Sequence, residues 1–244
     1  MRIAVISDIH GNAVALEAVL SDLAGEPIDR FVCLGDVAEA GPQPSQVVAR
    51  LRELGCLVVM GNTDAQMLIH EPYPPRNADT PRYNEIVLWC ADQLTPADLD
   101  TIRGFQATIE LALGGEITLL GFHGSPRSYN DIILAATPED ELSALLDGFH
   151  ATLMAGGHTH RQLLRRYDQA LIINPGSVGL PVECLAPNTP GYHPPWAEYA
   201  IISHECGRLG VDLRRVPLDV KAVVQEAFDS GMPHAEWWAS GWKQ

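Results

Sequence analysis

Five short apolar segments of this chain are each followed at once by a group of polar residues and glycines. In chain order, these groups are Asp8-x-His10, Gly35-Asp36, Gly61-Asn62-Thr63-Asp64, Gly121-Phe122-His123-Gly124 and Gly156-Gly157-His158-Thr159-His160. Helical patterns separate the first three apolar segments, an alternation that is typical of α/β proteins. Because the carboxyl ends of the strands in an open α/β sheet line one crevice, we expect the five groups to meet there.

Each group also has a structural explanation when it is considered alone. Asp8 and Asn62 can cap helices, Gly35-Asp36 can form an ordinary turn, and His123 can be a hydrogen-bonded structural histidine. His158-x-His160 is harder to explain in this way, because alternating imidazoles in a glycine-rich turn have no packing purpose. The repetition of polar groups after five strands therefore favours one shared site.

The shared site would combine carboxylates, one amide oxygen and several imidazoles. This mixture of ligand types suits Mn, Fe, Zn or Ni better than Ca or Mg. The neighbouring glycines would let the backbone segments approach one another closely. The sequence therefore predicts that the site binds transition-metal ions.

The rest of the pattern predicts a single domain over residues 1–244 with a strand-rich second half. We expect helices over 12–23, 45–54 and 220–228, and Thr-Pro pairs at 80–81, 95–96 and 137–138 should begin three more. The expected strands are 3–7, 31–34, 56–60, 105–113, 116–122, 151–155, 163–167, 170–173, 198–203 and 209–216, with a hairpin turn at Gly114-Gly115. An irregular loop at 182–196, which contains four prolines, and a Trp-rich tail at 230–244 complete the chain.

The chain has 244 residues, of which 31 are acidic and 16 are basic, so its formal net charge is −15. This charge argues against binding to a nucleic-acid polymer or to an anionic membrane, because both require a basic surface. It allows a phosphorylated substrate, since bound divalent cations invert the local charge. The five cysteines include no Cys-x-x-Cys pair, and no apolar segment is long enough to span a membrane. We therefore expect a cytoplasmic protein with reduced thiols.

The order and spacing of the five polar groups resemble those of the calcineurin-like metallophosphoesterases. Two segments, 35–42 and 174–181, resemble the small bacterial YfcE-like phosphodiesterase branch of that family. The likeness extends from residue 1 to about residue 216. It implies an α/β fold, built as a four-layer α/β/β/α sandwich with two mixed sheets. It also implies a metal-dependent phosphoesterase that hydrolyses a phosphodiester in a small phosphorylated substrate, for which a nucleotide is a candidate.

The resemblance further implies a dinuclear metal centre between the sheets, with two divalent transition-metal ions (Mn, Fe, Zn or Ni) and a bridging hydroxide. It assigns Asp8, His10 and His160 to one metal and Asn62, His123 and His158 to the other, with Asp36 bridging both. In this assignment the carboxylate of Asp36 holds the two ions together. The neutral amide of Asn62 limits the negative charge around them, so that they stay electrophilic.

The chain departs from the family pattern at two positions. Many family members have a histidine where this chain has Thr63, and a threonine cannot act as a proton donor to a leaving group near neutral pH. The branch commonly has an arginine where this chain has Val182, the first residue of the 182–196 loop. We expect this loop to border the site. Its His193 is a candidate for substrate binding or for the missing acid, and a solvent-facing loop histidine is the alternative.

Two other features have both a functional and a structural interpretation. Arg127, three residues after Gly124, is a candidate for substrate binding through a phosphate-facing guanidinium, and a plain surface arginine is the alternative. The tryptophans of the C-terminal tail either pack on their own domain or form the contact of a homo-oligomer. They are Trp237, Trp238 and Trp242.

A non-catalytic, metal-bearing protein-binding scaffold on the same fold is the alternative function. The retromer scaffold subunit has such a role, and it also lacks the histidine that Thr63 replaces here. This chain keeps all seven candidate ligands, and an idle site has no physical reason to hold them. The sequence therefore favours the hydrolase, with manganese among the candidate metals.

Overall fold

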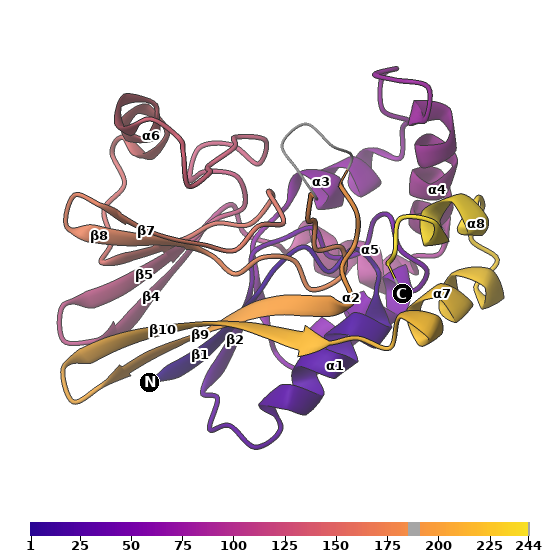
Figure 1. The fold of residues 1–244 in the computed structure, drawn as a ribbon. Helices are drawn as coiled ribbons and strands as arrows, with labels where there is room; N and C mark the ends of the chain where they lie inside the picture. Colours follow the sequence, from indigo (N-terminus) through magenta and orange to yellow (C-terminus); the bar gives the residue numbers. More distant parts are fainter. Residues whose placement is uncertain (185–190, 244) are drawn as a thin grey trace.

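A computed structural model describes residues 1–184 and 191–243, which contain two five-stranded sheets (Figure 1). The first sheet consists of β1 (Arg2–Ile6), β2 (Arg30–Cys33), β3 (Leu57–Val58), β9 (Trp196–Glu205) and β10 (Arg208–Pro217). The second sheet consists of β4 (Ile109–Gly114), β5 (Ile117–Gly121), β6 (Leu153–Ala155), β7 (Leu163–Tyr167) and β8 (Ala170–Asn174). The strand orders are β10-β9-β1-β2-β3 and β4-β5-β6-β8-β7.

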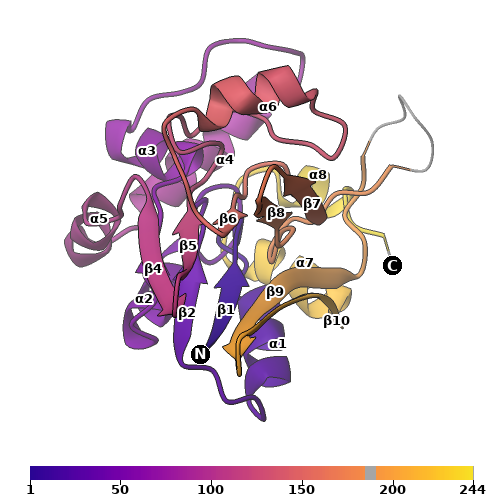
Figure 2. The ribbon, with the colours of Figure 1, turned by 90° about the vertical axis from the view of Figure 1, so that its left-hand side faces the viewer.

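The helices lie outside the two sheets and at one end of them (Figures 1 and 2). They are α1 (Ala13–Leu23), α2 (Pro44–Glu53), α3 (Asn62–Ile69), α4 (Thr80–Asp92), α5 (Pro96–Arg103), α6 (Glu139–Leu146), α7 (Val220–Asp229) and α8 (Ala235–Ala239). Buried side chains of α1, α2 and α7 form a core with the outer face of the first sheet. Leu142 and Leu146 of α6 pack against Phe122 and Ile172 on the outer side of the second sheet. The expected four-layer α/β/β/α sandwich is therefore confirmed.

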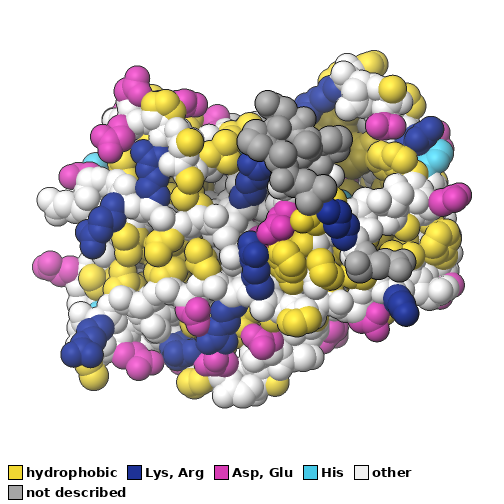
Figure 3. Space-filling model, viewed as in Figure 1, with side chains coloured by type: hydrophobic (Ala, Val, Ile, Leu, Met, Phe, Trp, Pro, Cys, Tyr) yellow, Lys and Arg dark blue, Asp and Glu magenta, His cyan; other side chains and the backbone are white. Residues whose placement is uncertain are grey.

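Alternation of side chains along β1 explains how the layers are held together. Ile3 and Val5 face the second sheet, whereas Ala4 and Ile6 face the helices. All four are fully buried, which is why this strand is a continuous apolar segment in the sequence. At the edge of the core between the sheets, the apolar side chains of β10 are partly buried, and a strip of apolar surface is visible there (Figure 3).

Parallel pairing places the strand ends that carry the polar groups at one end of the molecule. β1, β2 and β3 are parallel in the first sheet, as are β5, β6 and β8 in the second. Neighbouring parallel strands end at about the same height in each sheet, because Ile6 is paired with Cys33 and Gly121 is paired with Ala155. The carboxyl ends of these strands therefore open toward the end of the molecule where α3, α4 and α8 lie (Figure 1).

Some local expectations were wrong. β3 contains only two residues instead of the whole of 56–60, and neither α3 nor α8 was predicted. Thr95 caps α5 as expected, because its hydroxyl accepts the backbone N–H of Asp98. Thr80 and Thr137 do not cap their helices, and their hydroxyls accept N–H groups of residues that precede them.

The C-terminal tail packs on its own domain. Trp238 and Trp242 are buried in the core beside α7, and the indole N–H of Trp238 donates to the carbonyl of Ala40 at 2.7 Å. These two tryptophans are therefore not available for a contact between subunits. They pack on their own domain, as in the alternative interpretation of the sequence. Within residues 1–184 and 191–243, none of the helices has the length and apolarity needed to cross a bilayer.

Candidate metal centre

The polar groups that follow the strands meet at the carboxyl ends of the two sheets. They form two clusters of candidate ligands, and the donor atoms of each cluster lie within 4.8 Å of one another. The first cluster is Asp8, His10 and His160, and the second is Asp36, His123 and His158. Six of the seven sequence-predicted ligands are thus brought together in two sets of three.

Asp36 belongs to the second cluster but also lies close to the first, and the seventh candidate ligand, Asn62, lies beside the second cluster. Asp36 Oδ2 is 3.3 Å from His123 Nε2 and 3.8 Å from His10 Nε2, which belongs to the first cluster. Asn62 Oδ1 is 3.0 Å from His123 Nε2. The seven candidate ligands therefore lie in two neighbouring groups, and the Asp36 carboxylate is close to histidines of both.

Backbone carbonyls fix the orientation of three of the imidazoles. The Nδ1 atoms of His10, His123 and His160 lie 3.0, 2.6 and 2.6 Å from the carbonyl oxygens of Glu39, Leu34 and Leu180, respectively. A carbonyl only accepts, so each Nδ1 carries the proton in the neutral ring and each Nε2 keeps its lone pair. All three lone pairs then face the clusters, which is the arrangement that a metal-binding histidine needs.

Two observations test whether a cation fits this donor set. Asp8 Oδ1 is buried, accepts no hydrogen bond from the described residues, and lies 3.3 Å from His160 Nε2. The Nε2 atoms of His10 and His160 face each other at 3.0 Å. An unpartnered buried carboxylate oxygen beside two facing imidazole nitrogens is unfavourable without a positive charge. The donor set therefore fits divalent metal ions.

The charges of the clusters shift the pKa values of their members in both directions. Burial and the neighbouring His160 lower the pKa of His10 to about 4, so its imidazole is neutral near pH 7. Burial also opposes protonation of His123, but the charge of Asp36 outweighs it and raises the pKa of His123 to about 9. Protons and cations therefore compete for these donors, and metal binding should weaken as the pH falls.

The backbone of the site is strained. Five of the seven candidate ligands have a positive φ, a region that costs a residue other than glycine about 1–2 kcal/mol. They are Asp8 (53°), His10 (48°), Asp36 (55°), His158 (67°) and His160 (55°). Backbone hydrogen bonds between neighbouring loops hold these turns, such as Asp8 N–H to the carbonyl of Gly35 at 2.9 Å. Strain of this kind concentrates at functional sites.

Two glycines are required for the loops to come this close. A Cβ atom on Gly61 would lie 2.1 Å from Asp36 Oδ1. A Cβ atom on Gly157 would lie 2.2 Å from Ser7 Oγ and 3.0 Å from Asp8 Oδ2. A larger residue at Gly61 would therefore displace the Asp36 carboxylate, and one at Gly157 would displace Ser7, whose hydroxyl donates to Asp8 Oδ2.

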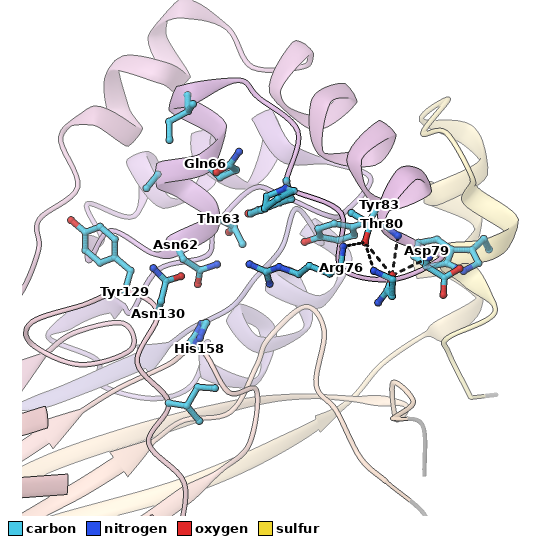
Figure 4. Close-up of a pocket in the computed structure, with 17 residues that line it drawn as sticks. Asn62, Thr63, Gln66, Arg76, Asp79, Thr80, Tyr83, Tyr129, Asn130 and His158 are labelled. Atoms are coloured by element: carbon cyan, nitrogen blue, oxygen red, sulfur yellow. Dashed lines mark hydrogen bonds between the residues drawn. The ribbon is translucent and has the colours of Figure 1, made fainter. Parts of the chain in front are cut away.

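A cavity of about 910 Å³ opens beside the second cluster (Figure 4). Asn62, Thr63 and His158 form its wall on the side of the metal centre, and the segment between α3 and α4 forms another wall. The Thr63 side chain is 4% exposed, and its hydroxyl has no hydrogen-bond partner among the described residues. The cavity therefore borders the second cluster directly, because Asn62 and His158 belong both to its wall and to the candidate ligands.

Two predicted substrate-binding residues are not among those that line this cavity. The Arg127 side chain is exposed, and its guanidinium donates to the carbonyl of Ala144 in α6 at 2.9 Å, an arrangement that favours the alternative of a surface arginine. His193 Nδ1 lies 2.9 Å from the carbonyl of Pro181, and the ring packs on Trp242 at a centroid distance of 5.1 Å. Neither residue lines the cavity.

The 182–196 loop is only partly described, because residues 185–190 lie outside the described residues. Glu183 and Tyr192 pair through two backbone hydrogen bonds, and Trp196 already belongs to β9. Of the residues of this loop that the structure describes, none is among those that line the cavity.

Three residues that contribute to this region were not predicted as site residues. Asp64 was part of the third polar group, but its role as a support for Asp36 was not recognised. Glu39 is fully buried, accepts the Tyr73 and Tyr83 hydroxyls, and has its pKa raised to about 8 by burial. Arg76 lines the cavity, and no local sequence pattern marks it.

A model of the calcineurin-like phosphoesterase superfamily domain matches residues 1–190. The chain belongs to this superfamily. Among curated proteins, this calcineurin-like phosphoesterase is 28% identical to uncharacterized protein MJ0912 of Methanocaldococcus jannaschii over 251 residues, which cover 96% of this chain and 94% of that protein. It is 38% identical to phosphodiesterase YfcE of Escherichia coli K12 over 85 residues, or 30% of this chain and 46% of YfcE.

A solved structure agrees with this assignment along almost the whole chain. The metallophosphoesterase from Sphaerobacter thermophilus aligns with this calcineurin-like phosphoesterase with a TM-score of 0.74 and 27% sequence identity. The alignment covers 99% of this chain and 97% of the other. The similarity therefore includes the C-terminal residues beyond the part that the family model matches.

Proposed function

We propose that this calcineurin-like phosphoesterase is a hydrolase that cleaves a phosphodiester at a dinuclear metal centre. The observation that carries the proposal is that Asp36, one of the three candidate ligands of the second cluster, also lies close to His10 of the first cluster. When bound, two divalent cations would supply Lewis-acid activation of the phosphoryl group and of the attacking water. Mn, Fe, Zn and Ni are the candidate ions for this mixture of ligands.

Different residues of the chain would hold the two ions. Asp8, His10 and His160 would hold one ion, and Asn62, His123 and His158 the other, with Asp36 shared. The strained turns fix these donors before a substrate arrives, so little reorganisation is needed during the reaction. Because Asn62 is neutral, the site carries less negative charge, which favours the approach of an anionic phosphoester.

The cavity beside the clusters supports a small organic phosphate as the substrate. Its volume of about 910 Å³ is large enough for a compound of the size of a nucleotide. Tyr73, Tyr129 and Trp237 line it, and aromatic walls suit a planar ring such as a nucleobase. A nucleotide diester is therefore the proposed class of substrate. A nucleic-acid polymer is not expected, because the net charge is −15.

Metal analysis combined with two simple substrates tests the proposal. The purified protein is freed of metal, reloaded separately with Mn, Fe, Zn or Ni, and its metal content is measured by elemental analysis. Two equivalents per chain are expected, together with hydrolysis of bis(p-nitrophenyl) phosphate faster than of p-nitrophenyl phosphate. Two bound equivalents without hydrolysis of either ester would favour the scaffold function instead. A single equivalent would contradict the dinuclear centre.

A further inference from the structure

Arg76 extends from the segment between α3 and α4 into the cavity, toward Asn62 and His158 (Figure 4). It is the one Lys or Arg among the described residues that line this cavity. Its guanidinium forms no ion pair and no side-chain hydrogen bond with the part of the chain that the structure describes, although it lies 5.9 Å from the Tyr73 ring. In a chain with a net charge of −15, Arg76 therefore brings a positive charge to the cavity wall that also contains the candidate ligands Asn62 and His158.

Local hydrogen bonds hold the backbone that presents Arg76. The Thr80 hydroxyl accepts the backbone N–H groups of Arg76 and Asn77, both at 3.0 Å. On the other side of Arg76, the backbone N–H of Tyr73 donates to Asn84 Oδ1 at 2.9 Å. The Asn84 Nδ2 group donates in return to the carbonyl of Tyr73, also at 2.9 Å. The position of Arg76 is therefore built into the fold, although its side chain is exposed.

A buried carboxyl group connects this segment to the candidate metal centre. The Glu39 side chain accepts the Tyr73 hydroxyl at 3.1 Å and the Tyr83 hydroxyl at 2.7 Å. The backbone carbonyl of the same residue accepts the Nδ1–H of His10 at 3.0 Å. The wall that carries Arg76 and the first cluster are thus anchored on one residue, which fixes their relative position.

Thr63 supplies a second unpartnered group in the same cavity. Its side chain is 4% exposed, its hydroxyl has no described partner, and it lines the cavity next to Asn62. Its backbone N–H donates to Asp36 Oδ1 at 2.9 Å, so the residue is held directly against the shared carboxylate. A buried hydroxyl without a partner has a free donor for a ligand.

We infer that Arg76 and Thr63 form a phosphate-binding pair, in which the guanidinium and the hydroxyl donate to non-bridging oxygens of the substrate phosphate. A planar guanidinium donates two parallel hydrogen bonds to a phosphate and keeps its positive charge at every physiological pH. Neither group acts as an acid, and no bond is made or broken by this pair. The inference rests on the proposed function, because it assigns the phosphate of the proposed substrate to these two residues.

Binding of inorganic phosphate and of AMP to the Mn-loaded protein, measured by calorimetry, tests the pair without any turnover. Loss of a charge-assisted hydrogen bond should raise Kd by about 10- to 100-fold in Arg76→Ala, with Arg76→Lys in between. Thr63→Val, which keeps the shape and removes the hydroxyl, should raise Kd by about 3- to 10-fold, and Thr63→Ser should bind like the wild type. Arg103→Ala is the matched control, because Arg103 is exposed on α5 and paired with Asp100.

The outcomes separate this inference from the proposed function. Metal content is measured in every variant, so that a loss of ions is not mistaken for a loss of phosphate binding. Phosphate binding that depends on Arg76 in a protein without esterase activity would support the pair and contradict the proposed function. Wild-type Kd and kcat/KM in Arg76→Ala would overturn the pair and leave the function standing. An equal loss in Arg103→Ala would also overturn it, because the effect would then be one of net charge.

Discussion

The Asp64 carboxylate holds the backbone turn at Asp36. Its Oδ2 accepts the N–H of Asp36 at 2.8 Å, and its Oδ1 accepts the N–H of Val37 at 2.9 Å. The same Oδ2 also accepts the N–H of Gly61 at 3.0 Å. Asp36 has a φ of 55°, and these bonds hold the strained turn that places its own carboxylate between the two clusters.

Asp64→Asn is expected to weaken metal binding although Asp64 contacts no metal itself. An asparagine offers one acceptor oxygen instead of two, so at least one N–H of the Asp36 turn loses its partner. We expect a destabilisation of about 1–3 kcal/mol and a metal Kd raised by about 10- to 100-fold. Denaturant unfolding and metal titration measure the two effects, and Asp100→Asn on the surface of α5 is the control. Unchanged metal affinity would show that the turn holds its shape without Asp64.

Asp36→Ala should lose most of both metal equivalents. Among the carboxylates of the described residues, only Asp36 lies within 4 Å of imidazole nitrogens of both clusters, so its removal should affect both sites. Asp8→Ala should affect the first site more than the second, because its Oδ1 lies beside His160. Elemental analysis after reloading distinguishes the two patterns. Two tightly bound ions in Asp36→Ala would contradict the shared-carboxylate assignment.

Gly61→Ala should damage the site through a single methyl group. The new Cβ would lie 2.1 Å from Asp36 Oδ1, so the carboxylate or the loop has to move. Overpacking of this kind typically costs about 1–3 kcal/mol, and the displaced carboxylate should also bind metal less tightly. Gly25→Ala is a matched control, because nothing lies within 4 Å of a Cβ at that position. Equal stability and metal content in the two variants would mean that the loops are less closely packed than described.

Much of the metal centre could be predicted from the sequence because each donor lies next to a strand end. Parallel pairing brings such ends to one end of each sheet, and the packing of the two sheets against each other then brings His10, which follows β1, to His160, which follows β6, although they are 150 positions apart. Arg76 could not be predicted in this way. Its position depends on the course of the proline-containing segment between α3 and α4. That segment is held by contacts with Glu39 and Thr80, and these contacts leave no local pattern in the sequence.

The Thr-Pro pairs illustrate the same limit within single helices. Thr95 caps α5 because Asp98 stands three residues later and accepts the Thr95 N–H in return. The corresponding residue after Thr80 is Tyr83, which cannot complete this pair of bonds and instead binds Glu39. The fold class follows from the repeated pattern of strands and helices, whereas such details depend on tertiary contacts.

Asp98 should make stability depend on pH at low pH. Burial opposes its ionisation, but hydrogen bonds from Ser45 and Thr95 outweigh this effect and lower its pKa. Because the pKa of Asp98 is lower in the folded than in the unfolded protein, its ionised form stabilises the fold. This stabilisation is fully present above the unfolded pKa of about 4 and is lost as the pH falls through the pKa of the folded protein. Asp98→Asn should therefore cost about 1–3 kcal/mol at pH 7 and much less near pH 2. Urea unfolding at both pH values measures the difference, and a constant cost at both would show that ionisation of Asp98 does not contribute.

The identity of residue 63 should determine how the rate depends on the leaving group. Thr63 lines the cavity beside Asn62 and cannot donate a proton near neutral pH, and His158 is the one histidine among the described lining residues. The departing oxygen should then carry its own negative charge, so aryl diesters should react quickly and alkyl diesters slowly. General acid catalysis contributes about 10²- to 10⁴-fold, and its absence should appear as a steep decrease of log kcat/KM with leaving-group pKa.

Thr63→His tests this account, because it places an imidazole at the same point of the cavity wall. The variant should flatten the dependence and favour poor leaving groups, provided that its metal content equals that of the wild type. Thr63→Gln is a control of similar size without an acid, and it should keep the steep slope. A flat dependence in the wild type would mean that another side chain protonates the leaving group. His193 is an unsuitable candidate for that role because its ring packs on Trp242.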